Sequence, residues 1–240
     1  PPRLSLNLRN HHQIQVVDGR AAFTGGMNIG DRHRVSPEPT GDVAADIHFE
    51  LSGPIAGQLE AEFLRTWAFA TGETEAPDPV RPEDQGAVYC RTLTDGPDED
   101  LDQITQLLGA AVAQAQASVR IMTPYFLPPR ELIGALQAAS LRGVGVTLVL
   151  PAKNNLPFVH WATRNMLWEL LYQGVEVFYQ PPPFNHAKLF VVDDVYTLIG
   201  SSNWDSRSLR LNFELQVEVF DAEFAGRMAA RIDDAARRGR

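Results

Sequence analysis

The chain has 240 residues, of which 44% are hydrophobic and 21% are charged, a composition typical of a folded globular protein rather than a disordered one. Acidic residues outnumber basic ones 30 to 21, and the formal net charge of -9 disfavours nucleic-acid binding through bulk charge. A single cysteine excludes an intrachain disulfide, and no apolar run approaches the roughly 18 residues of a membrane-spanning helix, so we expect any membrane contact of this segment to be peripheral.

In chain order, the first pattern is a group of polar residues around a short apolar run. Residues 10–13 read Asn-His-His-Gln, Asp18 follows the apolar run, and residues 25–28 read Gly-Gly-Met-Asn. Further on, Gly53 and a proline precede a helix that we expect to end at Trp67. Residues 72–85 are rich in Pro, Glu and Thr, a composition typical of a linker.

The second half alternates strands and helices. An acidic cluster at residues 98–100 precedes apolar residues at helical spacing, which predicts that a helix begins there. The next expected elements are a strand at 119–123, a helix at 130–142, a strand at 144–150, a helix at 160–172 and a strand at 175–179. A strand at 188–193 then pairs with 195–199, and 213–220 forms a further strand. This order predicts right-handed crossovers and a mostly parallel sheet.

The motif near the start recurs near the end, 175 residues later. Asn185 and His186 repeat the first Asn-His pair, an Asp again follows the histidine by seven residues, and an Asn again follows that Asp by ten. A long scaffold of expected elements precedes His186, whereas only residues 1–10 precede His11. We therefore expect an α/β fold of two pseudo-symmetric repeats with mixed, mostly parallel sheets flanked by helices, the first repeat truncated at its N-terminus. The repeats would be residues 1–85 and 86–240, related by an axis that brings the two motifs together.

The second motif favours phosphate chemistry. Residues two apart in a strand point to the same face, so His186 and Lys188 place an imidazole beside an ammonium group. The lysine supplies positive charge, Asn203 an amide donor and Ser201 a hydroxyl. From its spacing, Asp193 belongs to a turn rather than to proton transfer. The alternative, a packed core histidine beside a surface lysine, does not explain why the pattern occurs twice in register.

The two copies differ in their basic residue. Lysine occurs at only two positions, Lys153 and Lys188, because nearly all other basic residues are arginine. The first copy has Gln13 where the second has Lys188, and a glutamine can donate to a phosphate oxygen but brings no charge. His12 or Arg20 could supply that charge, and the sequence does not decide between them.

These motifs resemble those of a known superfamily. The pattern His-x-Lys-x4-Asp-x6-Gly-Ser-x-Asn is that of the phospholipase D superfamily, and residues 186–203 match it in full. Three further stretches look like bacterial cardiolipin synthases: residues 123–128, the Gly-Pro at residues 53–54, and residues 203–214. The resemblance covers nearly the whole chain, from His11 to about Asp221.

The resemblance implies a metal-free, two-step phosphodiester exchange that needs no cofactor. One histidine attacks the phosphorus of phosphatidylglycerol to give a phosphohistidine, and the other protonates the departing glycerol. The second histidine then takes a proton from the hydroxyl of a second phosphatidylglycerol, whose attack yields cardiolipin. By resemblance, His11 is the nucleophile and His186 the acid, although which histidine attacks stays open.

The resemblance also assigns roles to the remaining motif residues. The expected catalytic set is His11, His186, Lys188, Asp18 and Asp193. The expected substrate-binding residues are Gln13, Asn28, Ser201 and Asn203, and Asp46 and Glu214 are expected to orient the histidines. No metal ligand is expected, and His33, His48 and His160 are interpreted as structural or surface residues.

The implied partner is an anionic phospholipid at a membrane surface, with neither nucleic acid nor an obligate protein partner. The implied location is the bacterial cytoplasmic membrane, with room for transmembrane helices before the first copy. Two alternatives stay open. One is hydrolysis by a phospholipase D-like phosphodiesterase that uses water, on lipids or on nucleic acid. The other is a non-catalytic, lipid-binding relative, suggested by Gln13.

Overall fold

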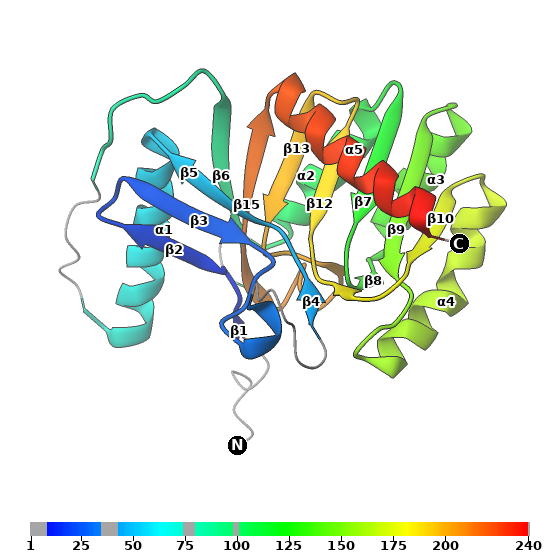
Figure 1. The fold of residues 1–240 in the computed structure, drawn as a ribbon, viewed down its shortest axis with the longest axis horizontal. Helices are drawn as coiled ribbons and strands as arrows, with labels where there is room; N and C mark the ends of the chain where they lie inside the picture. The colour runs from blue at the N-terminus through cyan, green and yellow to red at the C-terminus, as the bar shows by residue number, and fades with distance from the viewer. Residues whose placement is uncertain (1–8, 35–42, 74–79, 98–100, 240) are drawn as a thin grey trace.

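The computed structural model describes residues 9–34, 43–73, 80–97 and 101–239 (Figure 1). The acidic cluster at residues 98–100 and residues 74–79 of the expected linker lie outside this range.

A large mixed sheet forms the centre of the molecule, in the order β1-β15-β13-β12-β7-β9-β10, with β6 also paired to β15. Its strands are β1 (Arg9–Asn10), β6 (Tyr89–Asp95), β7 (Ser118–Met122), β9 (Gly145–Pro151), β10 (Glu176–Gln180), β12 (Leu189–Val192), β13 (Tyr196–Gly200) and β15 (Asn212–Phe220). Helices α2 (Gln103–Gln114), α3 (Arg130–Leu141) and α4 (Pro157–Tyr172) cover one face, and α5 (Ala222–Arg238) covers the other (Figure 1). Leu132, Leu136, Leu148 and Leu170 lie in the core on the first face.

The expected elements of the second half are confirmed, with small shifts of their ends. The sheet is mixed, as expected, but the expectation that it is mostly parallel is wrong. Strands β7, β9 and β10 are parallel to one another. On the other side of β7, strands β12, β13, β15 and β6 pair in antiparallel fashion, starting from the hairpin of β12 and β13, and among the described strands there only the two-residue β1 is parallel to its neighbour β15.

The first half forms a smaller layer. Strands β2 (Ile14–Val17), β3 (Ala21–Gly25) and β5 (His48–Ser52) make an antiparallel sheet, and α1 (Pro54–Thr71) packs against it (Figure 1). The expected end of this helix at Trp67 is wrong, because the helix continues to Thr71 and is closed by Gly72 at φ +75°. The order of strand, strand, strand and helix matches that of β12, β13, β15 and α5. The two-fold relation between the halves and the boundary at residue 85 stay predictions.

Short strands join the two halves at one edge. β1 pairs in parallel with the start of β15, and β4 (Ala44–Ala45) pairs in parallel with β11 (Phe184–Asn185). A further short pair, β8 (Phe126–Leu127) and β14 (Trp204–Asp205), lies close by (Figure 1). Within the described part of the chain, no helix combines the length and apolar character needed to cross a bilayer.

Candidate active site

Both motif histidines are held by backbone pairing with the opposite half of the chain. The amide of His11 donates to the carbonyl of Phe213 at 2.8 Å, and the amide of His186 donates to the carbonyl of Ala45 at 2.7 Å. The residue after each of these carbonyls is acidic, Glu214 in one case and Asp46 in the other. The same local pairing therefore places a carboxylate beside each histidine.

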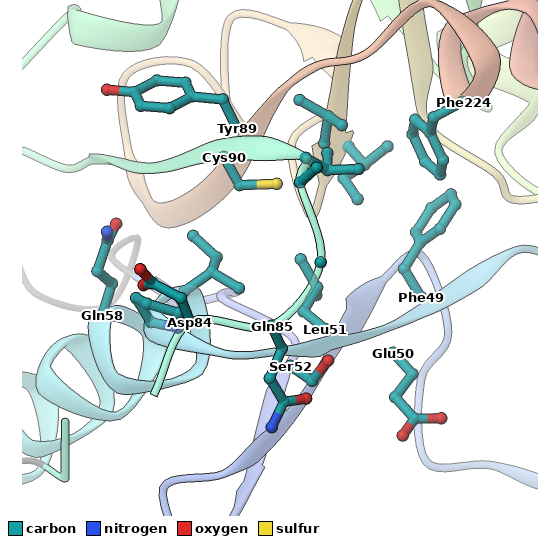
Figure 2. A pocket seen from close by; sticks show the side chains of 17 residues that line it. Phe49, Glu50, Leu51, Ser52, Gln58, Asp84, Gln85, Tyr89, Cys90 and Phe224 are labelled. Carbon is teal, nitrogen blue, oxygen red and sulfur yellow. The ribbon is translucent and has the colours of Figure 1, made fainter. Parts of the chain in front are cut away.

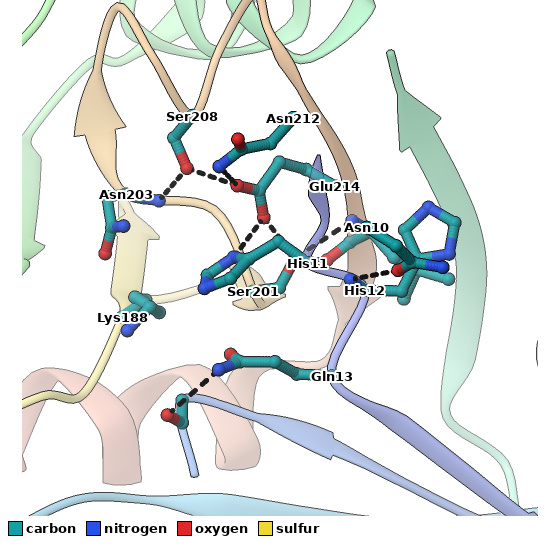
Figure 3. Close-up of polar contacts among 12 residues, drawn as sticks. Asn10, His11, His12, Gln13, Lys188, Ser201, Asn203, Ser208, Asn212 and Glu214 are labelled. Carbon is teal, nitrogen blue, oxygen red and sulfur yellow. Dashed lines mark hydrogen bonds and ion pairs between the residues drawn. The ribbon is translucent and has the colours of Figure 1, made fainter. Parts of the chain in front are cut away.

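The carboxylate of Glu214 organises the surroundings of His11 (Figure 3). Its Oε2 lies 2.9 Å from Nδ1 of His11 and also accepts from the hydroxyl of Ser201. Its Oε1 accepts from the hydroxyl of Ser208 and, at 3.0 Å, from the amide of Asn212. Glu214 is fully buried. A buried carboxylate with this many donors is held rigidly, so it fixes the orientation of the His11 ring.

His186 is more enclosed. Its Nδ1 lies 2.7 Å from the carbonyl oxygen of Gly26 and 3.3 Å from Oδ2 of Asp46. Burial lowers the pKa of His186, an effect that Asp46 opposes and Lys188 strengthens. At neutral pH this imidazole is therefore mostly in its neutral form.

Lys188 places a buried positive charge next to His186. Its Nζ lies 3.1 Å and 3.2 Å from the two ring nitrogens of His186 and donates to the carbonyl of that residue at 2.8 Å. Burial lowers the pKa of Lys188 to about 8, while the charges of Asp46 and Glu214 act in the opposite direction. Lys188 is therefore charged at neutral pH and lies within the electrostatic influence of both orienting carboxylates.

Gln13 points into the same region (Figure 3). Its Nε2 donates to Oδ1 of Asn28 at 2.6 Å, and its Oε1 is buried with no hydrogen-bond partner among the described residues. The backbone of Gln13 has φ +50°. The amide that stands where the second copy has lysine is thus bound to the protein itself.

The other expected substrate-binding residues lie beside these groups. Asn203 follows β13. Its backbone N–H donates to the hydroxyl of Ser208 at 3.1 Å, and its side-chain Oδ1 is buried without a partner among the described residues. Ser201 is bound to Glu214, so in this structure it supports the orienting carboxylate of His11. The site thus holds Asn28, Asn203 and Lys188 around the two histidines.

The two motif aspartates lie apart from this group. Asp193 sits at the far end of β12, where its carboxylate accepts from the amides of Gln116, Ala117 and Ser118, each at 2.8 Å. Burial alone would raise the pKa of Asp193, but these three backbone hydrogen bonds outweigh it and hold the pKa below its usual value. Asp18 occupies the corresponding turn between β2 and β3 at φ +51°. Both positions are turn positions, as the spacing indicated for Asp193.

Three rings lie around His186, and sequence reasoning connected neither His33 nor Phe184 with the site. His33, at the end of the short 3-10 helix Asp31–His33, is buried with its ring centroid 5.7 Å from that of His186 and its Nδ1 3.5 Å from Oδ2 of Asp46. Tyr125 and Phe184 lie at 6.2 Å and 5.9 Å from the same ring. No local pattern around His33 signals this contact, because it depends on how the first half folds over the second.

Among the described residues, no group of histidine, cysteine or acidic side chains has the arrangement of a metal site. A cavity of about 650 Å³ lies between β5, β6 and α5, where Phe49, Leu51 and Phe224 contribute apolar side chains (Figure 2). None of the site residues described above lines this cavity.

Comparison with known proteins shows the family to which the chain belongs. The family described as "Cardiolipin synthase, PLD-like domain" matches residues 108–235. Cardiolipin synthase A of Pseudomonas putida (strain GB-1) is 35% identical over 235 residues, which cover 97% of this chain and 48% of that protein. The major cardiolipin synthase ClsA of Bacillus subtilis (strain 168) is 34% identical over 239 residues, covering 98% of this chain and 49% of that protein. The chain thus spans about half the length of these curated relatives.

Solved structures show the same fold. Phosphatidylserine synthase of Haemophilus influenzae Rd KW20 superimposes with a TM-score of 0.68 at 15% identity, covering 96% of this chain and 62% of that one. Nuc from Salmonella typhimurium, a phospholipase D family member, superimposes with a TM-score of 0.55 at 24% identity, covering 64% of this chain and 97% of that one. At these identities the likeness concerns the fold alone.

Proposed function

The chain belongs to the cardiolipin synthase family with a phospholipase D-like domain, and on that premise we propose that it transfers a phosphatidyl group from one phosphatidylglycerol to another, forming cardiolipin and releasing glycerol. The observation that carries this proposal is that each motif histidine contacts a carboxylate from the other half of the chain. His11 is anchored by Glu214 and His186 by Asp46, with the Lys188 ammonium within reach of a phosphate held between them.

In the first step, Nε2 of His11 attacks the phosphorus, a P–N bond forms, and the bond from phosphorus to the glycerol oxygen breaks. Two features of His11 support this role. Its Nδ1 is engaged by Glu214, and no hydrogen bond from a described residue occupies its Nε2. Its side chain is also 26% exposed, so a substrate can reach it, whereas the side chain of His186 is 6% exposed.

His186 gives its proton to the departing glycerol oxygen in this step. Because burial lowers the pKa of His186, its ring is mostly neutral before substrate binds. An anionic phosphate bound beside it favours the protonated form, so we expect substrate binding to be accompanied by proton uptake. Binding of the phosphate thereby prepares His186, in its protonated form, to act as the acid.

In the second step, the now neutral His186 takes the proton of the acceptor hydroxyl, whose oxygen attacks the phosphohistidine and restores His11. Lys188, Asn28 and Asn203 face the non-bridging oxygens in both steps. Gln13 adds no charge, and the loss of one preorganised donor of this kind typically costs on the order of 2.7–4 kcal/mol in the transition state. We therefore expect a slower enzyme than a relative with lysine at this position.

The chain is expected to act at the surface of the bacterial cytoplasmic membrane, where its lipid substrate lies, without nucleic acid or an obligate protein partner. A second candidate function is lipid binding without turnover. The observation that favours it is the hydrogen bond from Nε2 of Gln13 to Oδ1 of Asn28, which engages one polar atom of each amide within the protein.

Product analysis tests the proposal. The chain is incubated with radiolabelled phosphatidylglycerol in detergent micelles, and His186→Ala serves as the inactive control. Cardiolipin that appears only with the unsubstituted chain supports transfer. Phosphatidic acid in its place would show hydrolysis, and the absence of both products would favour the lipid-binding alternative.

A further inference from the structure

The rim of the candidate site carries exposed apolar side chains on both sides of the two histidines. We propose that this rim is a bilayer-docking surface that inserts into the boundary between headgroups and acyl chains of a membrane containing anionic lipid. The inference rests on the proposed function, because it identifies the surface through which a lipid would enter that same site.

The first part of the rim comes from the loop after β3. Met27 and Ile29 flank Asn28, which contacts Gln13 inside the site. Met27 is exposed, and Ile29 is the most exposed of the large apolar side chains in the described chain. Transfer of a fully solvent-exposed isoleucine side chain from water into an apolar phase lowers the free energy of the system.

The second part lies on the His186 side. Tyr125, whose ring contacts His186, donates its hydroxyl to Asn155 at 2.8 Å, and Asn155 lies just before α4. The first turns of α4 then present Phe158, which is 81% exposed, and Trp161, with their rings in an edge-to-face contact. These two aromatic side chains therefore stand next to the wall of the site.

The third part lies on the His11 side, where the last turns of α1 carry Trp67 and Phe69. The ring of Phe69 lies 6.0 Å from that of Phe213, the neighbour of Glu214, and Phe69 is 81% exposed. Trp67 is about half exposed. In Figure 1, the end of α1 and the start of α4 lie on the same side of the molecule as β1, β4 and β8.

The charges on this rim fit an anionic surface in spite of the acidic balance of the chain. The 3-10 helix after Ile29 exposes Arg32, and Arg34 follows it. Asp31 lies beside them and pairs with Arg34 at 3.6 Å. The guanidinium of Arg32 donates to Nε2 of His33 at 3.3 Å, and the ring of His33 in turn contacts that of His186. Cations near a membrane surface are attracted to anionic headgroups, and tryptophan is enriched at the membrane interface.

A bilayer explains the combination better than a protein partner does. The apolar residues come from three separate segments, each of which adjoins a residue of the site or its neighbour, and a lipid substrate must pass this surface to reach the histidines. Separate apolar side chains can each insert a short distance into a lipid bilayer, because the lipids rearrange around them. A protein partner seated on this rim would block the approach of a lipid to the histidines.

Vesicle flotation tests the proposal on the full 240-residue chain, and helices α3 and α4 together supply a matched control. The double variant Ile29→Ser, Phe158→Ser removes two rim side chains. The control Leu141→Ser, Tyr172→Ser removes two side chains that are 71% and 81% exposed at the C-terminal ends of α3 and α4, whereas Phe158 lies at the N-terminal end of α4. Thermal melting of both variants verifies that the fold is retained.

We expect the unsubstituted chain to float with phosphatidylcholine vesicles that contain phosphatidylglycerol, and more weakly with phosphatidylcholine alone. The rim variant should partition at least about tenfold less, and the control within about twofold of the unsubstituted chain. Equal partition of the rim and control variants, or no flotation of the unsubstituted chain, would overturn the proposal. A stable dimer that the rim variant dissociates, seen by sedimentation without vesicle binding, would assign the surface to a second copy.

A separate measurement keeps this test apart from the proposed function. Turnover of a short-chain phosphatidylglycerol that is soluble as a monomer needs no bilayer. If the unsubstituted chain floats with vesicles but does not turn over this substrate, the docking surface stands and the transfer activity fails. If it turns the substrate over but does not float, the opposite conclusion holds.

Discussion

Nδ1 of His11 lies 2.9 Å from Oε2 of Glu214, although 203 residues separate them in the chain. His186 has the reciprocal relationship with Asp46 of the first half. Each histidine therefore takes its position from the half of the chain to which it does not belong. The site exists only when both halves are folded against each other.

Replacing either orienting carboxylate should reduce turnover without unfolding the protein. Glu214→Gln keeps the shape of the side chain but removes the charge that fixes the ring of His11, so we expect kcat to fall on the order of 10²-fold or more. Asp46→Asn should act in the same way through His186. Steady-state kinetics checks this, and the double variant should lose less than the product of the two single effects. Unchanged kcat in both single variants would contradict the orienting role.

Restoring a lysine at position 13 should increase activity. In Gln13→Lys, the ammonium would stand near Asn28 and bring the charge that the glutamine lacks. We expect kcat/KM for phosphatidylglycerol to rise about tenfold or more, because the added charge stabilises the phosphorane-like transition state. Gln13→Met is the control of similar length without a donor, and it should be less active than the unsubstituted chain. A Gln13→Lys variant no faster than Gln13→Met would exclude a role for charge at this position.

Activity should fall on the alkaline side as Lys188 loses its proton. The lysine is charged below its pKa of about 8 and neutral above it, and only the charged form attracts the phosphate. A profile of kcat/KM against pH should therefore decline through about pH 8. Lys188→Arg stays charged over this range, so an active arginine variant should lack the decline. If it shows the same decline, another group titrates.

Asp193 should contribute to stability rather than to chemistry. Asp193→Asn weakens three hydrogen bonds from the backbone amides of residues 116–118 at the start of β7, and we expect a loss of about 1–2 kcal/mol in the free energy of unfolding with kcat nearly unchanged. The pKa of Asp193 is lowered in the folded state, so its contribution is present above the unfolded pKa and disappears as the pH falls through the folded one. Urea unfolding at neutral and at acidic pH measures both effects. A large fall in kcat with unchanged stability would assign Asp193 to the reaction.

Much of the second half could be predicted from its sequence, because its helices and buried strands follow clear local periodicities. On the antiparallel side of the sheet, the pairing of β12 with β13 could also be predicted, because a tight turn joins them. The pairing of β15 with β13 and with β6 could not, since it depends on where more distant parts of the chain turn back. The spacing predicted that Asp193 lies in a turn, where the structure has it. The catalytic role that the resemblance implies for Asp18 and Asp193 stays a prediction.

The pairing of each histidine with its carboxylate could not be predicted from the sequence. Asp46 and Glu214 could be named as orienting residues, but which carboxylate meets which ring depends on the packing of the two halves. His33 was interpreted as a structural or surface residue, and its contact with His186 arises from the same packing. Local patterns carry no information on contacts of this kind.

Trapping the covalent intermediate tests the central claim most directly. A phosphatidyl ester of p-nitrophenol needs no acid to release its leaving group, so His186→Ala should react with it once and then stall for want of a base. The account predicts a mass increase of one phosphatidyl group per chain in His186→Ala, mapped to His11 and absent when His11→Ala is added. No adduct, or an adduct on another residue, would contradict the proposed roles of the two histidines.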